Sequence, residues 1–442
     1  MTLKPLALAL ALAAALTGPA RAVDLPTALK AAVQADPALA SALANRDAAI
    51  ENIAIARARL LPQISAQTTQ QMVNQTTTTG GAARHFTGQS NSSAISLRQT
   101  VYRLRDFVGL QIGQLQARYG ELRLETARSE TMARTTLAWV DVLGAKAQRD
   151  VYAATVDSVK VSALQEKRRF DAGDSTRDAV AEAEAQLALA RAQLVESEND
   201  LAAKLRAFNL LTRLAVTDFP GFRLPDGGQW AEPAEGEAAM LERALDTNPE
   251  LLAGRVTETI NERRLVQAGA DHHPTLDMVG SMNRAENDTT NTLGYQYHNA
   301  QVGLQLVIPI YSGGGINAAQ RQAAAALSAS VSDREAIEQR IRIQFASEWG
   351  SQRGLRERAA ASAELVRAVR EQRRAYEFGI KAGTRTWADL GATELQLARR
   401  EAERISINTA LYKSEARLLG LLPADDPAWD KWTTSLSSLA SR

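Results

Sequence analysis

Apolar and polar positions alternate along two short runs in the second half of the chain. The first run carries Leu276 and Met278 among polar neighbours, and the second extends over 300–308. A period of two predicts strands that have one apolar face. The matching runs of the first half, 63–73 and 90–101, alternate less clearly. We expect four strands, each with room for the ~9–11 residues of a tilted transmembrane strand.

The segments between the paired strands, 74–88 and 286–294, are rich in Thr, Asn and Gly. Polar segments of this kind between alternating runs are typical of loops. We therefore expect a polar loop between the two strands of each half.

The longer segments follow a helical pattern. We expect helices over six stretches: 26–60, 105–171, 176–214, 237–271, 316–379 and 386–419. The two longest contain no proline, and Pro62 and Pro274 end the helices that precede the strands, because a helix interior cannot accept the ring. The helix that follows each long helix, which we call the return helix, and the helix that precedes the strands together match one long helix in length. We expect the two shorter helices to stack end to end beside the long one.

Large apolar residues repeat every seven positions along the helices that follow each long helix. The series are Leu187, Leu194, Leu201 and Phe208, and then Leu390, Leu397, Leu411 and Leu418. Arg404 interrupts the second series. A seven-residue period predicts a coiled-coil seam, here between the two helices of a hairpin.

The two halves of the chain repeat each other. Pro37 follows Asp and recurs as Pro249, which follows Asn, while Pro62 recurs as Pro274; both displacements are 212 residues. Landmarks at one constant offset indicate a tandem duplication. The expected organisation is a signal peptide (1–22), a first repeat (23–216), an equatorial linker (217–236), a second repeat (237–420) and a C-terminal equatorial tail (421–442).

A tight Ala-Gly turn interrupts the helical pattern in each half, at Gly173 and, 210 residues later, at Gly383. Glycine permits the positive φ that a helix stop favours. Thr386 and Asp389 have the T-x-x-D spacing of a capping box at the next helix, and the segment from Ser175 to Asp178 has a similar pattern. Each copy is expected to form the tip of a helical hairpin.

The N-terminus has the features of a secretory signal: Lys4, an apolar core over 6–16 and an Ala-x-Ala site at 20–22. No later run approaches the ~18 apolar residues of a membrane helix. The chain contains no cysteine, which excludes disulfides, thiolate metal sites and a lipidated N-terminal cysteine. Its net charge of +1 gives no reason to expect a nucleic acid partner.

Four strands cannot close a barrel, and an open sheet edge cannot face lipid. Two chains would supply eight strands, whose interior fills with side chains, whereas three would supply twelve and leave a lumen. Polar alternate positions would then face water inside. Tyr102 and Tyr311 are expected to end the second strand of each half and fit an interfacial aromatic belt.

These features together resemble the TolC family of outer membrane channel proteins. The resemblance rests on the duplicated proline landmarks, the tyrosine-ended strands and the tip sequence over 382–390, and it covers essentially all of the mature chain. It implies a mainly α fold with a β-barrel portion, in which a homotrimer forms a twelve-stranded barrel continued by a helical periplasmic tunnel. It also implies a passive exit duct in the lipid bilayer of the outer membrane. The partners would be a periplasmic membrane-fusion (adaptor) protein and an inner-membrane ABC or proton-driven transporter.

In that family the hairpin tips close the periplasmic mouth, and rings of aspartate narrow it. The resemblance places one ring at Asp389 and puts Ala392 at the next ring position. It makes Arg385 the residue that ties neighbouring hairpins together, with Asp178 as the candidate partner. The residues expected at the tip and in partner docking are Gly173, Asp178, Gly383, Thr384, Arg385 and Thr386. Asp389 also has a purely structural interpretation, as a helix cap.

Two other functions stay open at this point. The Thr-Arg-Thr tip favours type I protein secretion, but a lipid-free multidrug-efflux outer membrane factor is an alternative. A soluble periplasmic coiled-coil adaptor is a second alternative, and it would place no strand in lipid. Because the sequence holds no nucleophile elbow, metal-ligand quartet or nucleotide loop, we expect no enzymatic activity and no cofactor.

Overall fold

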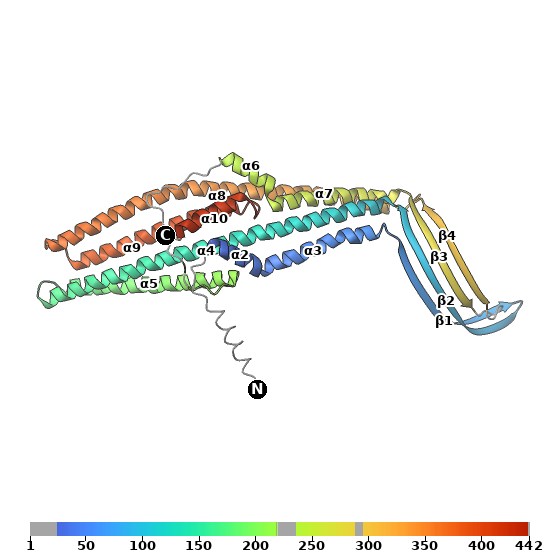
Figure 1. The fold of residues 1–442 in the computed structure, drawn as a ribbon, viewed down its shortest axis with the longest axis horizontal. Coiled ribbons are helices and arrows are strands. Elements are labelled where there is room, and N and C mark those ends of the chain that lie inside the picture. Colours follow the sequence, from blue (N-terminus) through green and yellow to red (C-terminus); the bar gives the residue numbers. More distant parts are fainter. Residues whose placement is uncertain (1–23, 218, 220–235, 288–294, 441–442) are drawn as a thin grey trace, which may run out of the picture. The chain divides into compact units, whose positions relative to one another are not determined.

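The computed structural model describes residues 24–217, 219, 236–287 and 295–440 (Figure 1). The expected signal peptide and most of the expected linker lie outside the described residues. So does 288–294, the greater part of the polar loop expected between the strands of the second half. The described chain forms two compact units, and each contains segments of both halves. One unit comprises residues up to 42 with 125–249 and 338–442, and the other comprises 43–124 and 250–337.

The chain is mainly helical, with one small antiparallel sheet, as the sequence predicts. The helices are α2 (Leu25–Ala35), α3 (Pro37–Ala58), α4 (Leu104–Asp171), α5 (Arg177–Thr212), α6 (Glu237–Thr247), α7 (Pro249–Gly269), the short 3₁₀ helix η1 (Ala270–His272), α8 (Gly315–Lys381), α9 (Trp387–Leu419) and α10 (Pro427–Ala440). None of them, within the described part of the chain, has an apolar stretch long enough to cross a membrane.

Four strands form the sheet in chain order, β1 (Gln63–Thr79), β2 (Ala82–Tyr102), β3 (Thr275–Asn287) and β4 (Tyr295–Val307) (Figure 1). The prediction of a loop over 74–88 is wrong, because all of these residues except Gly80 and Gly81 belong to β1 or β2. Gly80 and Gly81, with φ of 61° and 87°, turn the chain between them. Positive φ at both turn positions suits a tight hairpin, and the β-branched threonines before it favour extended backbone.

Apolar side chains gather on one face of this sheet and remain exposed. Ile64 stands opposite Leu97, Leu97 opposite Gly280, and Gly280 opposite Val302, so these residues share a face. The large exposed residues of this face include Ile64, Met72, Ile95, Met282, Val302, Leu304 and Leu306, each between 51% and 76% exposed. We call it the apolar face. The strand alternation predicted for the second half is therefore confirmed.

Two predicted helices are each broken at a proline landmark. The helix expected over 26–60 divides into α2 and α3 at Asp36, and the helix expected over 237–271 divides into α6 and α7 at Asn248. Both junction residues leave the helical region, with ψ of 115° and 118°. The proline that follows disfavours helical backbone at the residue before it, and this explains the break.

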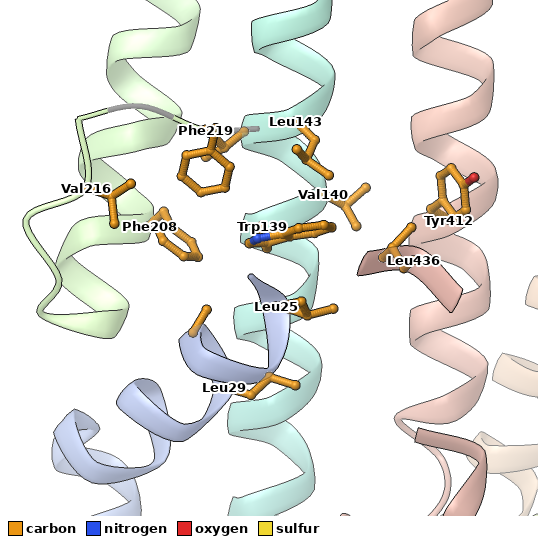
Figure 2. Packing of buried hydrophobic residues seen from close by; sticks show 12 residues of the cluster. Leu25, Leu29, Trp139, Val140, Leu143, Phe208, Val216, Phe219, Tyr412 and Leu436 are labelled. Atoms are coloured by element: carbon orange, nitrogen blue, oxygen red, sulfur yellow. The ribbon is translucent and has the colours of Figure 1, made fainter. Parts of the chain in front are cut away.

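Trp139 of α4 is fully buried at the centre of an apolar cluster (Figure 2). Leu25 and Leu29 of α2 pack here, together with Phe208 of α5, whose ring lies 5.1 Å from that of Phe219. α5 and α2 thus meet beside α4, in agreement with the expected end-to-end stacking of the return helix and the helix that precedes the strands.

The predicted seven-residue seam is confirmed in α9, where its leucines are buried, whereas in α5 only Phe208 is fully buried and the three leucines are partly buried. Leu390, Leu397, Leu411 and Leu418 are all at most 6% exposed, and Phe208 is fully buried. Leu187 packs against Val159 of α4 and Leu395 of α9 in a smaller cluster. Seam residues therefore pack inside the chain.

Candidate functional site at the hairpin tips

Both hairpin tips are built by the same turn. Gly173 has φ of 85° and donates to the Phe170 carbonyl, while the next N–H reaches back to Arg169. Gly383 has φ of 73° and donates to the Ile380 carbonyl, while Thr384 N–H reaches Gly379. This pair of bonds is the Schellman motif, which requires a left-handed residue after the helix. Glycine at the two tips is therefore a backbone requirement.

The second tip has a complete capping box. Thr386 Oγ1 accepts a hydrogen bond from Asp389 N–H at 3.1 Å, and Asp389 Oδ2 accepts one from Thr386 N–H at 3.0 Å. Asp389 is half-buried and lies in the first turn of α9. The positive end of the helix dipole stabilises a carboxylate at this position. The structural interpretation of Asp389 is thus confirmed.

The first tip lacks this reciprocal box. Thr176, rather than Ser175, caps α5 by accepting from Ala179 N–H at 3.3 Å. The prediction of a capping box from Ser175 to Asp178 is wrong. The cap lies one residue later, at Thr176, and Ala179 then occupies the position where the box requires a carboxylate. Asp178 is exposed in the first turn of α5.

A buried carboxylate that the sequence analysis missed joins the two tips. Glu166 of α4 is fully buried, and its Oε2 accepts from the backbone N–H of Trp387 at 2.9 Å. Its Oε1 accepts a hydrogen bond from Ser175 Oγ. Glu166 therefore holds the first residue of α9 and the turn before α5 together. An acidic residue near the end of a long, charged helix gives no sequence signal for this contact.

Arg385 lies over its own hairpin. Its guanidinium carbon is 4.5 Å from the centre of the Tyr376 ring, and a Cβ on Gly379 would come within 2.7 Å of Arg385 Cγ. The structure pairs Arg385 with Tyr376 within the chain, rather than with Asp178. Thr384 Oγ1 also turns inward and donates to the Gly379 carbonyl at 3.1 Å.

The second hairpin carries a network of charges just behind its tip. Arg373 Nε lies 3.1 Å from Glu394 Oε1, and Arg373 Nη2 lies 2.9 Å from Glu377. Burial raises the pKa of Glu394, and the nearby Arg373 charge opposes that shift. Glu184, the equivalent residue of the first half, is exposed. The duplicated sequence therefore supports unequal hairpins.

The two interfacial tyrosines are not placed alike. Tyr102 is the last residue of β2 and lies 6.5 Å from the Phe107 ring. Tyr311 is 87% exposed and follows β4, which ends at Val307, so the expected strand end at Tyr311 is wrong. Pro309 has no N–H to donate to a strand ladder, which explains the earlier end.

The described residues contain no group of three or more acidic or histidine side chains that would hold a metal. The fold and the tips define a duplicated protein of long helical hairpins with a small sheet whose apolar face is uncovered. Such a chain has the elements of a membrane-anchored helical channel.

The chain belongs to the outer membrane efflux protein family, whose sequence profile matches residues 28–212 and 240–423. It is 28% identical over 367 residues to outer membrane protein TolC of Vibrio cholerae, covering 80% of each chain. It is also 28% identical over 298 residues to the alkaline protease secretion protein AprF of Pseudomonas aeruginosa, covering 66% of this chain and 62% of that protein.

The fold is that of solved outer membrane channels. The outer membrane protein VceC of Vibrio cholerae superposes with a TM-score of 0.76 at 14% identity, covering 90% of this chain and 96% of that one. The resemblance drawn from the sequence is confirmed. The chain is an outer membrane protein of the efflux family and serves as an exit duct.

Proposed function

We propose that three copies of this chain form the duct. The observation that carries this proposal is the four-stranded sheet, in which the outer strands β1 and β4 each pair on one side only within the described part of the chain. An unpaired edge in lipid leaves backbone groups without partners, so each edge requires another chain. Three sheets supply twelve strands, which enclose a lumen when their apolar faces point to lipid. Tyr102 and Tyr311 then lie near the membrane interface.

The duct is passive and has no enzymatic activity of its own. A periplasmic adaptor and an inner-membrane transporter, of the ABC or proton-driven type, supply the energy and the cargo. The tips are the surface for this assembly, through the exposed Asp178, Thr384, Arg385 and Thr386 beside the turn glycines Gly173 and Gly383. In support, these polar residues cluster where both hairpins end.

Asp389 forms the gate of the proposed duct. Three copies at one mouth place three carboxylates close together, and like charges in proximity favour cation entry. Its bond to Thr386 N–H uses only one of the two carboxylate oxygens, so the capping role leaves charge available. Arg385 ties neighbouring hairpins when it leaves the Tyr376 ring.

Type I protein secretion is the proposed transport role. Two relatives, AprF and the proteases secretion protein PrtF of Dickeya chrysanthemi, are named for protease secretion. Export of small molecules by a lipid-free multidrug-efflux factor is the second candidate, and a relative named outer membrane efflux protein BepC, of Brucella suis, favours it. Comparing secreted proteins and antibiotic sensitivity in a strain that lacks this gene separates the two.

The oligomer is tested by extraction and mass. We expect the chain in the membrane fraction, released only by detergent, with the mass of a trimer that heating converts to a monomer. A monomer recovered without detergent would instead support the soluble adaptor. A detergent-extracted dimer would contradict the twelve-stranded arrangement while leaving the membrane location intact.

A further inference from the structure

A cavity of about 510 Å³ lies at one end of the sheet, where strands meet helices. It is lined by the end of β2, the start of α4, the start of β3 and the residues that follow α3. Four arginines contribute to its wall: Arg59, Arg98, Arg103 and Arg105. All of these belong to the unit that contains the sheet.

The aspartates around the cavity do not balance the arginines. Asp277 Oδ2 forms ion pairs with Arg98 Nη2 and Arg103 Nη2, each at 2.6 Å. Asp271 Oδ2 forms one with Arg105 Nη1 at 2.5 Å. Asp106 lies 3.6 Å from Arg103. Arg59 is exposed and, among the described residues, makes no ion pair. Four guanidinium groups therefore face three carboxylates.

The arginines around the cavity carry more N–H donors than the aspartates engage. A guanidinium carries five N–H donors, and Asp277 engages Arg98 and Arg103 through a single oxygen. Arg103 Nε is buried without a hydrogen bond in the described part of the chain, and the carboxylate oxygen Asp106 Oδ2 is 3.6 Å away. Asp277 Oδ1 is likewise buried without a donor. The side chains of Arg98 and Arg105 are 55% and 52% exposed, so their remaining donors are open to a ligand.

The strand residues that line the cavity lie on the face of the sheet opposite the apolar face. Gln63 stands opposite Arg98, and Arg98 stands opposite Val279, so these residues share one face. Thr275 and Val307 stand opposite each other on the same face. All of them alternate with residues of the apolar face, such as Ile64, Leu97 and Met278. With the apolar face toward lipid, as in the proposed duct, a ligand reaches the cavity from water. Planar guanidinium groups match the oxygens of phosphate and carboxylate through paired hydrogen bonds.

We propose that this cavity binds a small multivalent oxyanion from solution, with inorganic phosphate as the simplest example. Arg59 and Arg105 contribute the accessible charges, and Arg98 and Arg103 are held in place by Asp277. In the proposed trimer this face lines the duct, so three sites would surround the conduit. That consequence rests on the proposed function, whereas anion binding by the chain does not.

The test is calorimetric titration of the full detergent-solubilised protein with phosphate, and with chloride at the same ionic strength to allow for screening. We expect a phosphate-specific signal that weakens roughly tenfold or more in Arg59→Gln/Arg105→Gln, because each lost bond to a charged group weakens binding by about that factor. Arg57→Gln is the matched control, since this exposed arginine lies on α3 outside the cavity.

Arg59→Gln alone is a second variant, because Arg59 is exposed and makes no ion pair among the described residues, so its replacement should leave the fold unchanged. It should weaken binding several-fold. Equal phosphate and chloride signals in the natural protein, or natural affinity in the double variant, would overturn the proposal. Binding that appears only with phosphatidic acid in nanodiscs would overturn the assignment to a water-borne anion. Since the readout is binding, a protein that binds phosphate but conducts no ions would contradict only the duct.

Discussion

Glu166 on α4 and Trp387 at the start of α9 are joined across the two hairpins by a 2.9 Å hydrogen bond. The acceptor is a buried carboxylate, and the donor is a first-turn N–H that has no partner within its own helix. Because Ser175 donates to the same carboxylate, one side chain fixes both tips. Movement of either hairpin away from the other must break this contact.

Replacing Glu166 with alanine should free the second tip. The change removes the acceptor of two hydrogen bonds at a buried position, which costs about 1–3 kcal/mol. We expect faster amide exchange at Trp387 and faster tryptic cleavage at Lys381 and Arg385. Glu166→Gln is the control, because its amide oxygen can still accept from Trp387 N–H. Exchange rates that are unchanged in Glu166→Ala would show that other packing holds the tips.

Two substitutions at Asp389 separate its capping role from its charge. Asp389→Asn removes the charge but keeps an oxygen that accepts from Thr386 N–H, whereas Asp389→Ala removes both. Cation preference, measured from reversal potentials in a salt gradient, should fall in both variants. The alanine variant should lose about 1 kcal/mol more hairpin stability than the asparagine variant, because it also loses the hydrogen bond to Thr386 N–H. Full cation preference in Asp389→Asn would refute the gate role and leave the cap.

Gly383 should resist substitution for a backbone reason alone. Its φ is 73°, yet a Cβ at this position would meet no atom within 4 Å. Gly383→Ala should therefore destabilise the hairpin by about 1 kcal/mol, and Gly383→Asn by less, because asparagine tolerates the left-handed region. Thermal unfolding of the two variants tests this order. Equal losses would indicate that the side chain meets a neighbouring copy.

The sequence predicted the features that depend on local pattern. Element order, the turn glycines, the capping box at Thr386 and the heptad seam follow from residue spacing over one or two turns. The same reasoning failed at 74–88, because strands that are polar on both faces lack an apolar alternation. It also failed at Asp36, since the helical pattern continues on both sides of the break.

The features that the sequence did not predict depend on contacts between distant segments. Glu166 and Trp387 are 221 residues apart, and nothing in either sequence neighbourhood indicates the other. The position of Arg385 over Tyr376 depends on the small Gly379 between them in space, which allows the side chain to fold back. Sequence comparison of the two halves suggested equivalent hairpins, but burial distinguishes Glu394 from Glu184.

Asp36 provides the clearest pH-dependent contact in the described chain. Its Oδ1 accepts from Ala38 N–H at 2.9 Å and starts α3, while its Oδ2 accepts from Thr131 Oγ1 at 2.6 Å and from Arg134. Burial alone raises the pKa of Asp36, but the hydrogen bonds and the Arg134 charge outweigh it and hold that pKa below its ordinary value of 3.8.

The direction of that shift fixes the pH dependence. Because the folded carboxyl has the lower pKa, its contribution to stability is complete above the unfolded value of 3.8 and is lost as pH falls through the folded value. Asp36→Asn keeps an acceptor for the Ala38 N–H but loses the pairing with Arg134. We expect it to cost about 1–2 kcal/mol near neutral pH and to weaken the acid-induced loss of protection in α2 and α3.

Amide exchange of α2 and α3, followed from about pH 5 down to about pH 2, measures this effect locally. Thr131→Val is the matched control, since it removes one donor to the carboxylate while the Arg134 pair and its pH dependence persist. If acid releases α2 and α3 equally in the natural protein and in Asp36→Asn, another carboxylate governs the transition. In that case the depressed pKa of Asp36 has no bearing on how the helices part at this proline.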